Sequence, residues 1–556
     1  MEKIELLKKQ GDALFTNRGN LMSLWQEIAN NFYPERADFT ETRELGQEFA
    51  GHLDTSYPLL ARRDLGNQIG GMLRPTNKEW FSIIKRYDDD LDTSGQQWLE
   101  WAAKIQKRAM YDPVAMFTRA TKEADHDWAA FGQTVLSMRM NYNENALLYR
   151  CWHLRDVAWQ EDSIGRVGTV FRKWKPDALT LSQIFGKADD NHRHPSLHGI
   201  HRKVADCLKK DPYKEINVYH CEVPAETYGD PEQWGDKPLV SIYYDIDNNH
   251  VMEEIAIYEG EYVIPRWQTV SGSQYAFSPA TVAALPDARL IQAVASVLLD
   301  ASEKIVDPPI VAVQEAIRSD ISIYAGGITW VDADYDERLG EVLREIRQTG
   351  NLPVGFEMQA DTREMIAEAF FLNKLALPPP VTGMTAYETS ERVAEYIRQA
   401  LPLFEPMESE YNGAICDKTF NILMKNGAFG NPQSMPESLY GGDISFQFES
   451  PMREAVERVK GQRFVETKDL IASAMELDPA AGYIIDPVEA VRDALEGMGS
   501  PAKWRRPKDE IEAMKAADKQ AAELQQTLQI AQQGADVAKT ANEAGITEES
   551  VEGMNV

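Results

Sequence analysis

Two apolar helical segments, each followed by consecutive prolines, constrain the fold of this chain more than any other feature. In the first, apolar residues recur at helical spacing over residues 290–305, and Pro308–Pro309 end the run. The second reads TREMIAEAFFLNKLAL. We expect it to begin near Asp361, which can cap its N-terminus, and Pro378–Pro380 lie just beyond it. If the two helices pair antiparallel, they form a stalk that carries residues 306–360 at its far tip.

A stalk of two such helices exposes more than one apolar stripe to water. Copies packed side by side around an axis, as in a ring, would cover these stripes. Helical periodicity alone leaves an ordinary two-helix hairpin within one monomer as the alternative.

The stretch LALPPPVTGMTAYE follows the second helix and combines three prolines with a glycine. Prolines stop a helix and limit backbone freedom, whereas Gly383 permits a turn. Thr385 and Glu388 have the spacing of a capping box for a further helix that opens at Ala386. A stiff surface connector and a loop held at a fixed distance from a partner are both compatible with this pattern.

Helix and strand patterns are segregated along the chain. Helical periodicity covers four early segments, residues 2–32, 61–75, 98–110 and 114–130. Short segments rich in β-branched and aromatic residues follow, such as INVYHCEV and LVSIYYDID, and they predict antiparallel strands. This order favours an α+β fold over an alternating one. Beyond Trp504 the Ala, Gln and Glu-rich sequence predicts a helical or disordered tail that frays after Gly534.

The formal net charge of −30 is the unusual feature of a composition that is otherwise ordinary for a globular protein. An acidic chain does not adhere passively to phosphates, which argues against a conventional DNA-binding module. The four cysteines are widely spaced without a CxxC, so we expect reduced thiols in a cytosolic compartment. The N-terminal sequence has no apolar core of a secretory signal, and no apolar run is long enough for us to expect a membrane span.

Four of the nine histidines fall within NHRHPSLHGIH, and they are His192, His194, His198 and His201. Together with Cys207 and Cys221 downstream, they are of the types that bind zinc. However, Pro195 and Gly199 interrupt any helix here, and no HExxH motif is present. A polar, solvated loop is the preferred interpretation, and we predict neither a metal nor a cofactor.

The usual motifs of catalysis are missing from the sequence. There is no GxxxxGK[ST] phosphate loop, no GxGxxG after a strand and no GxSxG elbow. The acidic run YDDDLD at 87–92 is typical of a solvated face. We therefore predict no catalytic residue. Two alternatives stay open: a metal-dependent hydrolase that uses the His192–His201 cluster, and a monomeric adaptor with a helical stalk.

Several segments resemble, in order, the portal proteins or head-to-tail connectors of short-tailed bacteriophages. ARRDLGNQIGGMLRPTNKEWFSI is similar to the early helix of that family with its following Pro and W-F pair. SGSQYAFSPATVAALPDARLIQ resembles the segment that leads into the stem, and MTAYETSERVAEYIRQALPLFEPMESE the long helix after the tunnel loop. ISFQFESPMREA resembles the return toward the crown. The resemblance covers about residues 5 to 500, and the tail after 505 matches no part of the family.

The resemblance implies an α+β portal-type fold with a helical stem, an α/β clip, a mixed wing and a helical crown, assembled as a ring of about twelve subunits. The parts would be the wing at 1–285, stem helices at 286–305 and 361–375, the clip at 306–360, the tunnel loop and wing return with its long helix at 376–450, the crown at 451–505 and the tail at 506–556.

It also implies a function without catalysis. Double-stranded DNA would pass through the ring during packaging and ejection, at one vertex of the virion capsid, after assembly in the host cytoplasm. The terminase large subunit would dock on the clip and be replaced by tail or adaptor proteins. Major capsid and scaffolding proteins would be further partners, and no membrane is involved. A channel lined by acidic residues would repel phosphates and keep DNA sliding.

The resemblance places candidate residues at the channel and at the clip. The tunnel-loop candidates are Lys374, Leu377, Pro378, Pro379, Pro380, Val381, Thr382, Gly383 and Met384. Arg363 is a second possible basic contact in the channel. The candidates for docking at the clip are Tyr324, Trp330 and Phe356.

Overall fold

The computed structural model describes residues 2–44, 46–76, 79–86, 92–141, 144–186, 199–229, 234–306, 310–312, 343–345, 352–375, 405–430 and 435–448, together with 467–468, 470–471, 490–491, 494–495, 506 and 508–543. The chain divides into two compact units. The first joins Met1–Trp80 to Lys107–Lys425, and the second joins Phe81–Gln106 to Asn426–Val556. Each unit is described by itself.

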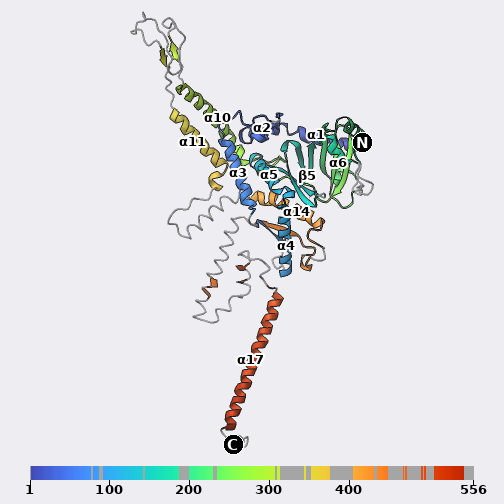
Figure 1. The fold of residues 1–556 in the computed structure, drawn as a ribbon, viewed down its shortest axis with the longest axis vertical. Helices are drawn as coiled ribbons and strands as arrows, with labels where there is room; N and C mark the ends of the chain where they lie inside the picture. Colours follow the sequence, from blue (N-terminus) through green and yellow to red (C-terminus); the bar gives the residue numbers. More distant parts are fainter. Residues whose placement is uncertain are drawn as a thin grey trace. The chain divides into compact units, whose positions relative to one another are not determined.

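The early helices of the first unit, drawn in Figure 1, bury residues at helical spacing, as predicted from their periodicity. They are α1 (Glu2–Thr16), α2 (Gly19–Phe32), α3 (Tyr57–Leu73) and α5 (Phe117–Phe131), with short 3-10 helices at Pro34–Arg36, Pro113–Ala115 and Leu154–Asp156. In α5 the buried residues Phe117, Ala120, Ala124, Trp128 and Phe131 recur every three or four positions. The predicted segment 2–32 is therefore two helices rather than one.

Two antiparallel sheets follow, and they confirm the α+β fold. The smaller has the order β3-β2-β9, and the larger has the order β4-β5-β6-β7-β8. The strands are β2 (Val135–Asn141), β3 (Ala146–Trp152), β4 (Val157–Glu161), β5 (Val167–Trp174), β6 (Val218–Pro224), β7 (Leu239–Asp245), β8 (His250–Ile257) and β9 (Tyr262–Val263). The predicted strands INVYHCEV and LVSIYYDID are β6 and β7, which pair along their whole length.

Helices cover both faces of the larger sheet. On one face Leu7 of α1 packs with Tyr219 and Cys221 of β6. On the other face α6 (Ala178–Phe185) and α7 (Arg202–Lys210) pack against Val218 and Tyr243. Successive side chains of β6 lie on opposite faces of the sheet, because a strand has a period of two residues. His220 and Glu222 therefore lie on the same face as Val218, the face covered by α6 and α7. The short helix α8 (Ala225–Tyr228) follows β6 directly.

One glycine is required at the end of α5. Gly132 ends this helix in the left-handed conformation with φ of 71°, and its own amide donates to the Trp128 carbonyl. A Cβ at this position would overlap the backbone of Phe277. Glycine is thus demanded both by the turn and by the close approach of the chain.

The predicted helix pair is present in the first unit. It consists of α10 (Pro279–Val306) and α11 (Leu352–Ala369), followed by the short α12 (Leu372–Leu375). Beyond the tip of α10, β10 (Ile310–Ala312) pairs antiparallel with β11 (Leu343–Glu345). The expected start of the second helix near Asp361 is wrong, because α11 begins at Leu352. Pro353 is tolerated there, since the first turn of a helix needs no N–H donor at that position.

A continuous helix closes the first unit. Its described part starts at residue 405, passes through a π-helix at Met407–Gly413 and continues as α14 (Ala414–Lys425). The four cysteines are free, as expected.

In the second unit, β1 (Phe81–Lys85) pairs antiparallel with β12 (Ile444–Phe448). It also holds most of α4 (Thr93–Met110), a 3-10 helix at Glu437–Leu439 and the C-terminal helix α17 (Lys508–Glu543). The sequence predicts fraying of the tail after Gly534, yet α17 continues through this residue. One glycine costs a helix only about 1 kcal/mol, which the many Ala and Gln residues around it offset.

Candidate functional site

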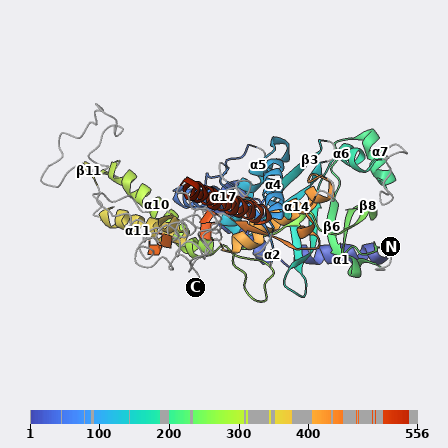
Figure 2. The same cartoon turned by 90° about the horizontal axis from the view of Figure 1, so that it is seen from below.

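The two-helix stalk is the first candidate, and its helices lie side by side in both ribbon views (Figures 1 and 2). Gly355, early in α11, lies against the Leu298 side chain late in α10, so the helices run antiparallel as predicted. A Cβ at Gly355 would clash with Leu298, which means that the glycine allows this close contact.

The base of the stalk is fixed to the body of the first unit. Gln292 exchanges two hydrogen bonds with the backbone of Thr55, each 2.9 Å long. The Thr281 hydroxyl donates to the Ala130 carbonyl at 2.8 Å, and the rings of Phe370 and Phe32 lie 5.3 Å apart. The stalk is therefore held by contacts with α2, α3 and α5 at one end.

The stalk exposes large apolar side chains, most of them farther from this base. They are Leu290, Val297, Leu299, Ile305 and Val306 on α10, and Val354, Phe356, Met358 and Met365 on α11. Val297 is 67% exposed and Val306 is 85% exposed. Within the described part of the chain α10 is the one helix long and apolar enough to cross a membrane, but helices of soluble proteins can pass the same test of length and composition. An apolar surface of this extent indicates a protein partner.

The structure describes only some of the candidates from sequence. Arg363 is exposed on α11, with its guanidinium carbon 5.7 Å from the centre of the Tyr57 ring. Phe356 is 54% exposed and belongs to the stalk helix α11. Lys374 belongs to α12, although its side chain is outside the described part. The others lie outside the described residues: Leu377, Pro378, Pro379, Pro380, Val381, Thr382, Gly383, Met384, Tyr324 and Trp330.

The histidine cluster is described only at its end. His201 is the N-cap of α7, where its Nδ1 accepts a hydrogen bond from the Lys203 amide. This capping role explains His201 without a metal. His192, His194 and His198 lie outside the described residues.

A buried polar anchor at the π-helix was not foreseen from the sequence. Tyr411 and Asn412 are fully buried; the Tyr411 hydroxyl donates to Asp125 at 2.9 Å, and the Asn412 side-chain carbonyl accepts from Arg74 at 2.7 Å. Arg74 and Asp125 are themselves a buried ion pair. The anchor therefore joins the end of α3 and the middle of α5 to the helix that leads into α14. π-helical turns are rare and occur mostly where function or packing requires an inserted residue.

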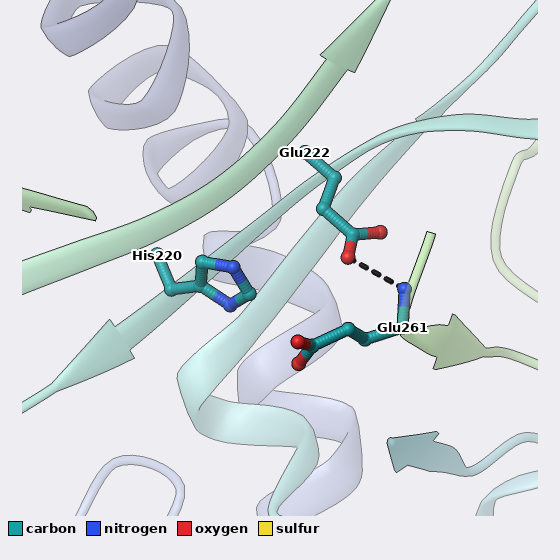
Figure 3. A group of neighbouring side chains, drawn as sticks. All are labelled: His220, Glu222 and Glu261. Carbon is teal, nitrogen blue, oxygen red and sulfur yellow. Dashed lines mark hydrogen bonds between the residues drawn. The ribbon is translucent and has the colours of Figure 1, made fainter. Parts of the chain in front are cut away.

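A second buried cluster lies between the two sheets. His220 and Glu222 of β6 and Glu261, just before β9, bring ligand-type atoms within 4.8 Å of one another (Figure 3). No other such group occurs within the described part of the chain. It must therefore be tested as a metal site.

Hydrogen bonds already occupy both ring nitrogens of His220. The Tyr262 hydroxyl accepts from Arg172 Nε at 2.8 Å, which leaves its own hydrogen for His220 Nδ1. Nε2 then carries the ring proton and donates to the Ser241 hydroxyl at 2.9 Å. Burial, and the positive charge of Arg172, lower the pKa of His220 well below its usual value, so the ring is neutral. No lone pair of this histidine is left for a metal.

Glu222 also has protein partners. Its carboxylate accepts from the Glu261 amide at 2.6 Å, and Gly260 has no side chain to obstruct this approach. From α14, Lys418 donates to the carbonyls of Gly260 and Tyr262. These contacts clamp residues 260–262 between β6 and α14.

Cationic side chains of the protein surround the carboxylates of the cluster. Arg139, Arg172 and Lys418 all act on Glu261 and favour its charged form, although burial raises the pKa of this carboxyl overall. Burial and the adjacent Glu261 raise the pKa of Glu222 to about 7. Three cations around two carboxylates would repel a divalent metal. We therefore assign the cluster a structural role.

The sequence contains a signal that could have predicted the proximity of two of these three residues. The alternation of β6 places His220 and Glu222 on one face, so their proximity could have been predicted. The approach of Glu261 depends on the pairing of β9 with β2, which no local pattern reveals.

Comparison with known proteins shows to which family this chain belongs. The family model described as "Bacteriophage head to tail connecting protein" matches residues 5–505. The chain belongs to this family. Among curated connectors, it is 24% identical over 562 residues to the probable portal protein of Bordetella phage BPP-1, covering 96% of this chain and 94% of that protein. It is 19% identical over 561 residues to the portal protein of Salmonella phage epsilon15, covering 98% of this chain and 96% of that protein.

The region that matches the connector family includes the stalk and the body but ends before α17. That helix begins at Lys508, beyond the last residue matched by the family model. As the family description states, these connectors join head to tail, which is a structural role rather than a catalytic one.

Proposed function

We propose that this connector is the portal subunit of a phage: identical copies form a ring at one capsid vertex, through which double-stranded DNA is packaged and later ejected. The observation that carries the proposal is the match of the connector family over residues 5–505. The two relatives that align along nearly the whole chain are named as portal proteins, which supports it. The hydrolase and the monomeric adaptor have no comparable support.

Ring formation is supported by the apolar side chains of the stalk. They lie on both α10 and α11, so one copy can offer one flank of its stalk to the next copy and receive a different flank from the previous one. Contacts of this head-to-tail kind close into rings, here of about twelve subunits. The exposed apolar surface would then be covered without a membrane.

The charge of the chain supports passage of DNA without adhesion. At −30 per subunit, a ring repels phosphates wherever acidic side chains line its channel. In the proposed arrangement, residues 376–384 approach the DNA, and Lys374 and Arg363 provide brief cationic contacts. Apart from these two contacts, the acidic channel would repel the DNA and let it slide.

The parts of the ring follow from this assignment. Wing residues 1–285 and 376–450 would meet capsid and scaffolding proteins, and α10 with α11 would form the stem. The clip at its tip, with Tyr324, Trp330 and the nearby Phe356, would dock the terminase large subunit and then the tail or adaptor proteins. The crown at 451–505 and the tail beyond it would lie on the head side.

The ring is tested by the mass of the purified chain in solution and by electron microscopy. Wild-type protein is expected to form rings with a central hole. Val297→Asp on the stalk should leave folded monomers, because it buries a charge between copies. Ile164→Asp is the matched control: Ile164 is 76% exposed, at the turn between β4 and β5, and its variant should still form rings. A monomeric wild-type protein, or rings unaffected by Val297→Asp, would contradict the proposal.

A further inference from the structure

One helix face carries positive charge in this acidic chain. Helix α7 presents four cations to solvent around a single carboxylate, and the α7 face consists of these exposed residues, Arg202, Lys203, Asp206, Lys209 and Lys210. At 100° per residue they fall within an arc of roughly 120°. Within the described part of the chain, no ion pair involves any of the four cations.

The α7 face is held on a rigid support. On the opposite side of the helix, Val204 is buried with Phe185 and Leu181 of α6 and with Tyr243 of the larger sheet. His201 caps the N-terminus. A fixed base of this kind presents the cations in one arrangement, which a freely moving tail would not.

The first two cations stand where the helix itself disfavours them. Arg202 and Lys203 occupy the first turn of α7, which contains no acidic residue. The N-terminus of a helix carries partial positive charge, so cations there reduce helix stability, whereas Lys209 and Lys210 in the last turn increase it. Local stability thus explains the second pair but not the first. A placement that weakens the local structure is typical of a binding surface.

The pattern of charge distinguishes between partners. Two pairs of cations lie roughly 10 Å apart along the helix, with Asp206 between them. A nucleic-acid backbone is uniformly negative, and Asp206 would repel it. A protein surface can instead set carboxylates against each pair and leave the centre neutral or basic. Tyr213, just beyond α7 and 74% exposed, adds an aromatic side chain of the type enriched in protein interfaces.

We propose that the α7 face is a docking surface for an acidic patch on a different protein of the phage particle. The partner presents carboxylates to the pairs Arg202/Lys203 and Lys209/Lys210, and these contacts orient the larger sheet and its helices against it. The assignment of the partner to the phage particle rests on the proposed function. The contact itself depends only on the charges of α7.

The experiment is zero-length cross-linking of assembled particles with a carbodiimide, which joins an amine to a carboxylate only when the two are in contact. Cross-links are expected from Lys203, Lys209 or Lys210 to Asp or Glu residues of another protein, identified by mass spectrometry. In Arg202→Glu/Lys203→Glu particles, position 203 no longer carries an amine, and the yield of the cross-links from Lys209 and Lys210 should fall at least fivefold. Because glutamates favour the first turn of a helix, the melting temperature of this variant should be equal to or above that of the wild type.

A matched control makes the same change of charge elsewhere. Lys515→Glu/Lys519→Glu on the exposed part of α17 should leave the α7 cross-links intact. Cross-links from the α7 face only to a second copy or to carboxylates of its own chain would overturn the proposal. So would their absence, or binding of duplex DNA that the α7 variant loses. Failure of the wild-type chain to enter particles would instead refute the proposed function.

Discussion

The buried carboxyl of Glu222 should make the stability of this protein fall as the pH rises toward neutrality. Its pKa is about 7 in the folded chain against 4.5 as the ordinary value, a difference of 2.5 units. Between these two values the folded state binds a proton that the unfolded state has lost. Stability from this group is thus fully present below pH 4.5 and is lost as the pH rises through 7. At about 1.4 kcal/mol per pH unit, the loss is roughly 3–4 kcal/mol.

Glu222→Gln removes this titration but keeps a carbonyl oxygen for the Glu261 amide. The variant should gain stability relative to the wild type as the pH increases from 5 to 8.5, because the neutral amide avoids the cost of a buried charge. Thermal or urea unfolding at several pH values measures the difference. Glu253, whose pKa burial also raises, adds to the slope in both proteins and cancels in the comparison. Glu261 interacts with Glu222, so the difference includes the interaction between these two carboxyls.

The control is Glu226→Gln, an exposed position just beyond the end of β6 that should follow the wild-type pH profile. If Glu222→Gln loses stability with pH as steeply as the wild type, the carboxyl of Glu222 is not the group that titrates, and its burial does not explain the pH dependence.

Three further outcomes test other parts of the structure. Tyr411→Phe should cost about 1.5–3 kcal/mol in urea unfolding, since it removes a buried hydrogen bond to the charged Asp125; no measurable loss would show that the π-helix is not anchored there. Gly132→Ala should destabilise the chain well beyond Gly165→Ala, because both have positive φ but only Gly132 faces backbone that a Cβ would overlap. Equal costs would refute the close approach. Lys374→Glu and Lys374→Ala should reduce DNA packaging or genome retention in virions; unchanged values for both would remove Lys374 from the channel.

Local patterns predicted the types of structure well. The spacing of apolar residues over 290–305 indicated α10, and short segments rich in β-branched and aromatic residues indicated β6 and β7. The error at the start of α11 shows the limit of such signals. Asp361 is a good cap, but a residue suited to a helix end can also lie inside a helix when packing continues on both sides. In α11 the Leu298 side chain against Gly355 extends the packing toward Leu352.

Candidate residues were harder to foresee. The π-helix was not predicted, because a shift of one residue in helical register leaves no clear mark in hydrophobic periodicity. The polar anchor joins Asp125 to Tyr411, which are separated by 286 residues in the sequence. The channel and clip candidates, Lys374 included, remain predictions that follow from family resemblance.

The sequence by itself determined the helical and strand segments, the net charge of −30, the proline-bounded stalk and the membership of the connector family. These depend on residues close together along the chain, or on order and composition. Only the tertiary structure decided which polar groups share a buried site. Periodicity shows that a side chain is buried but not what it meets, and the cost of burying Glu222, Asp125 or Arg74 is set by those neighbours.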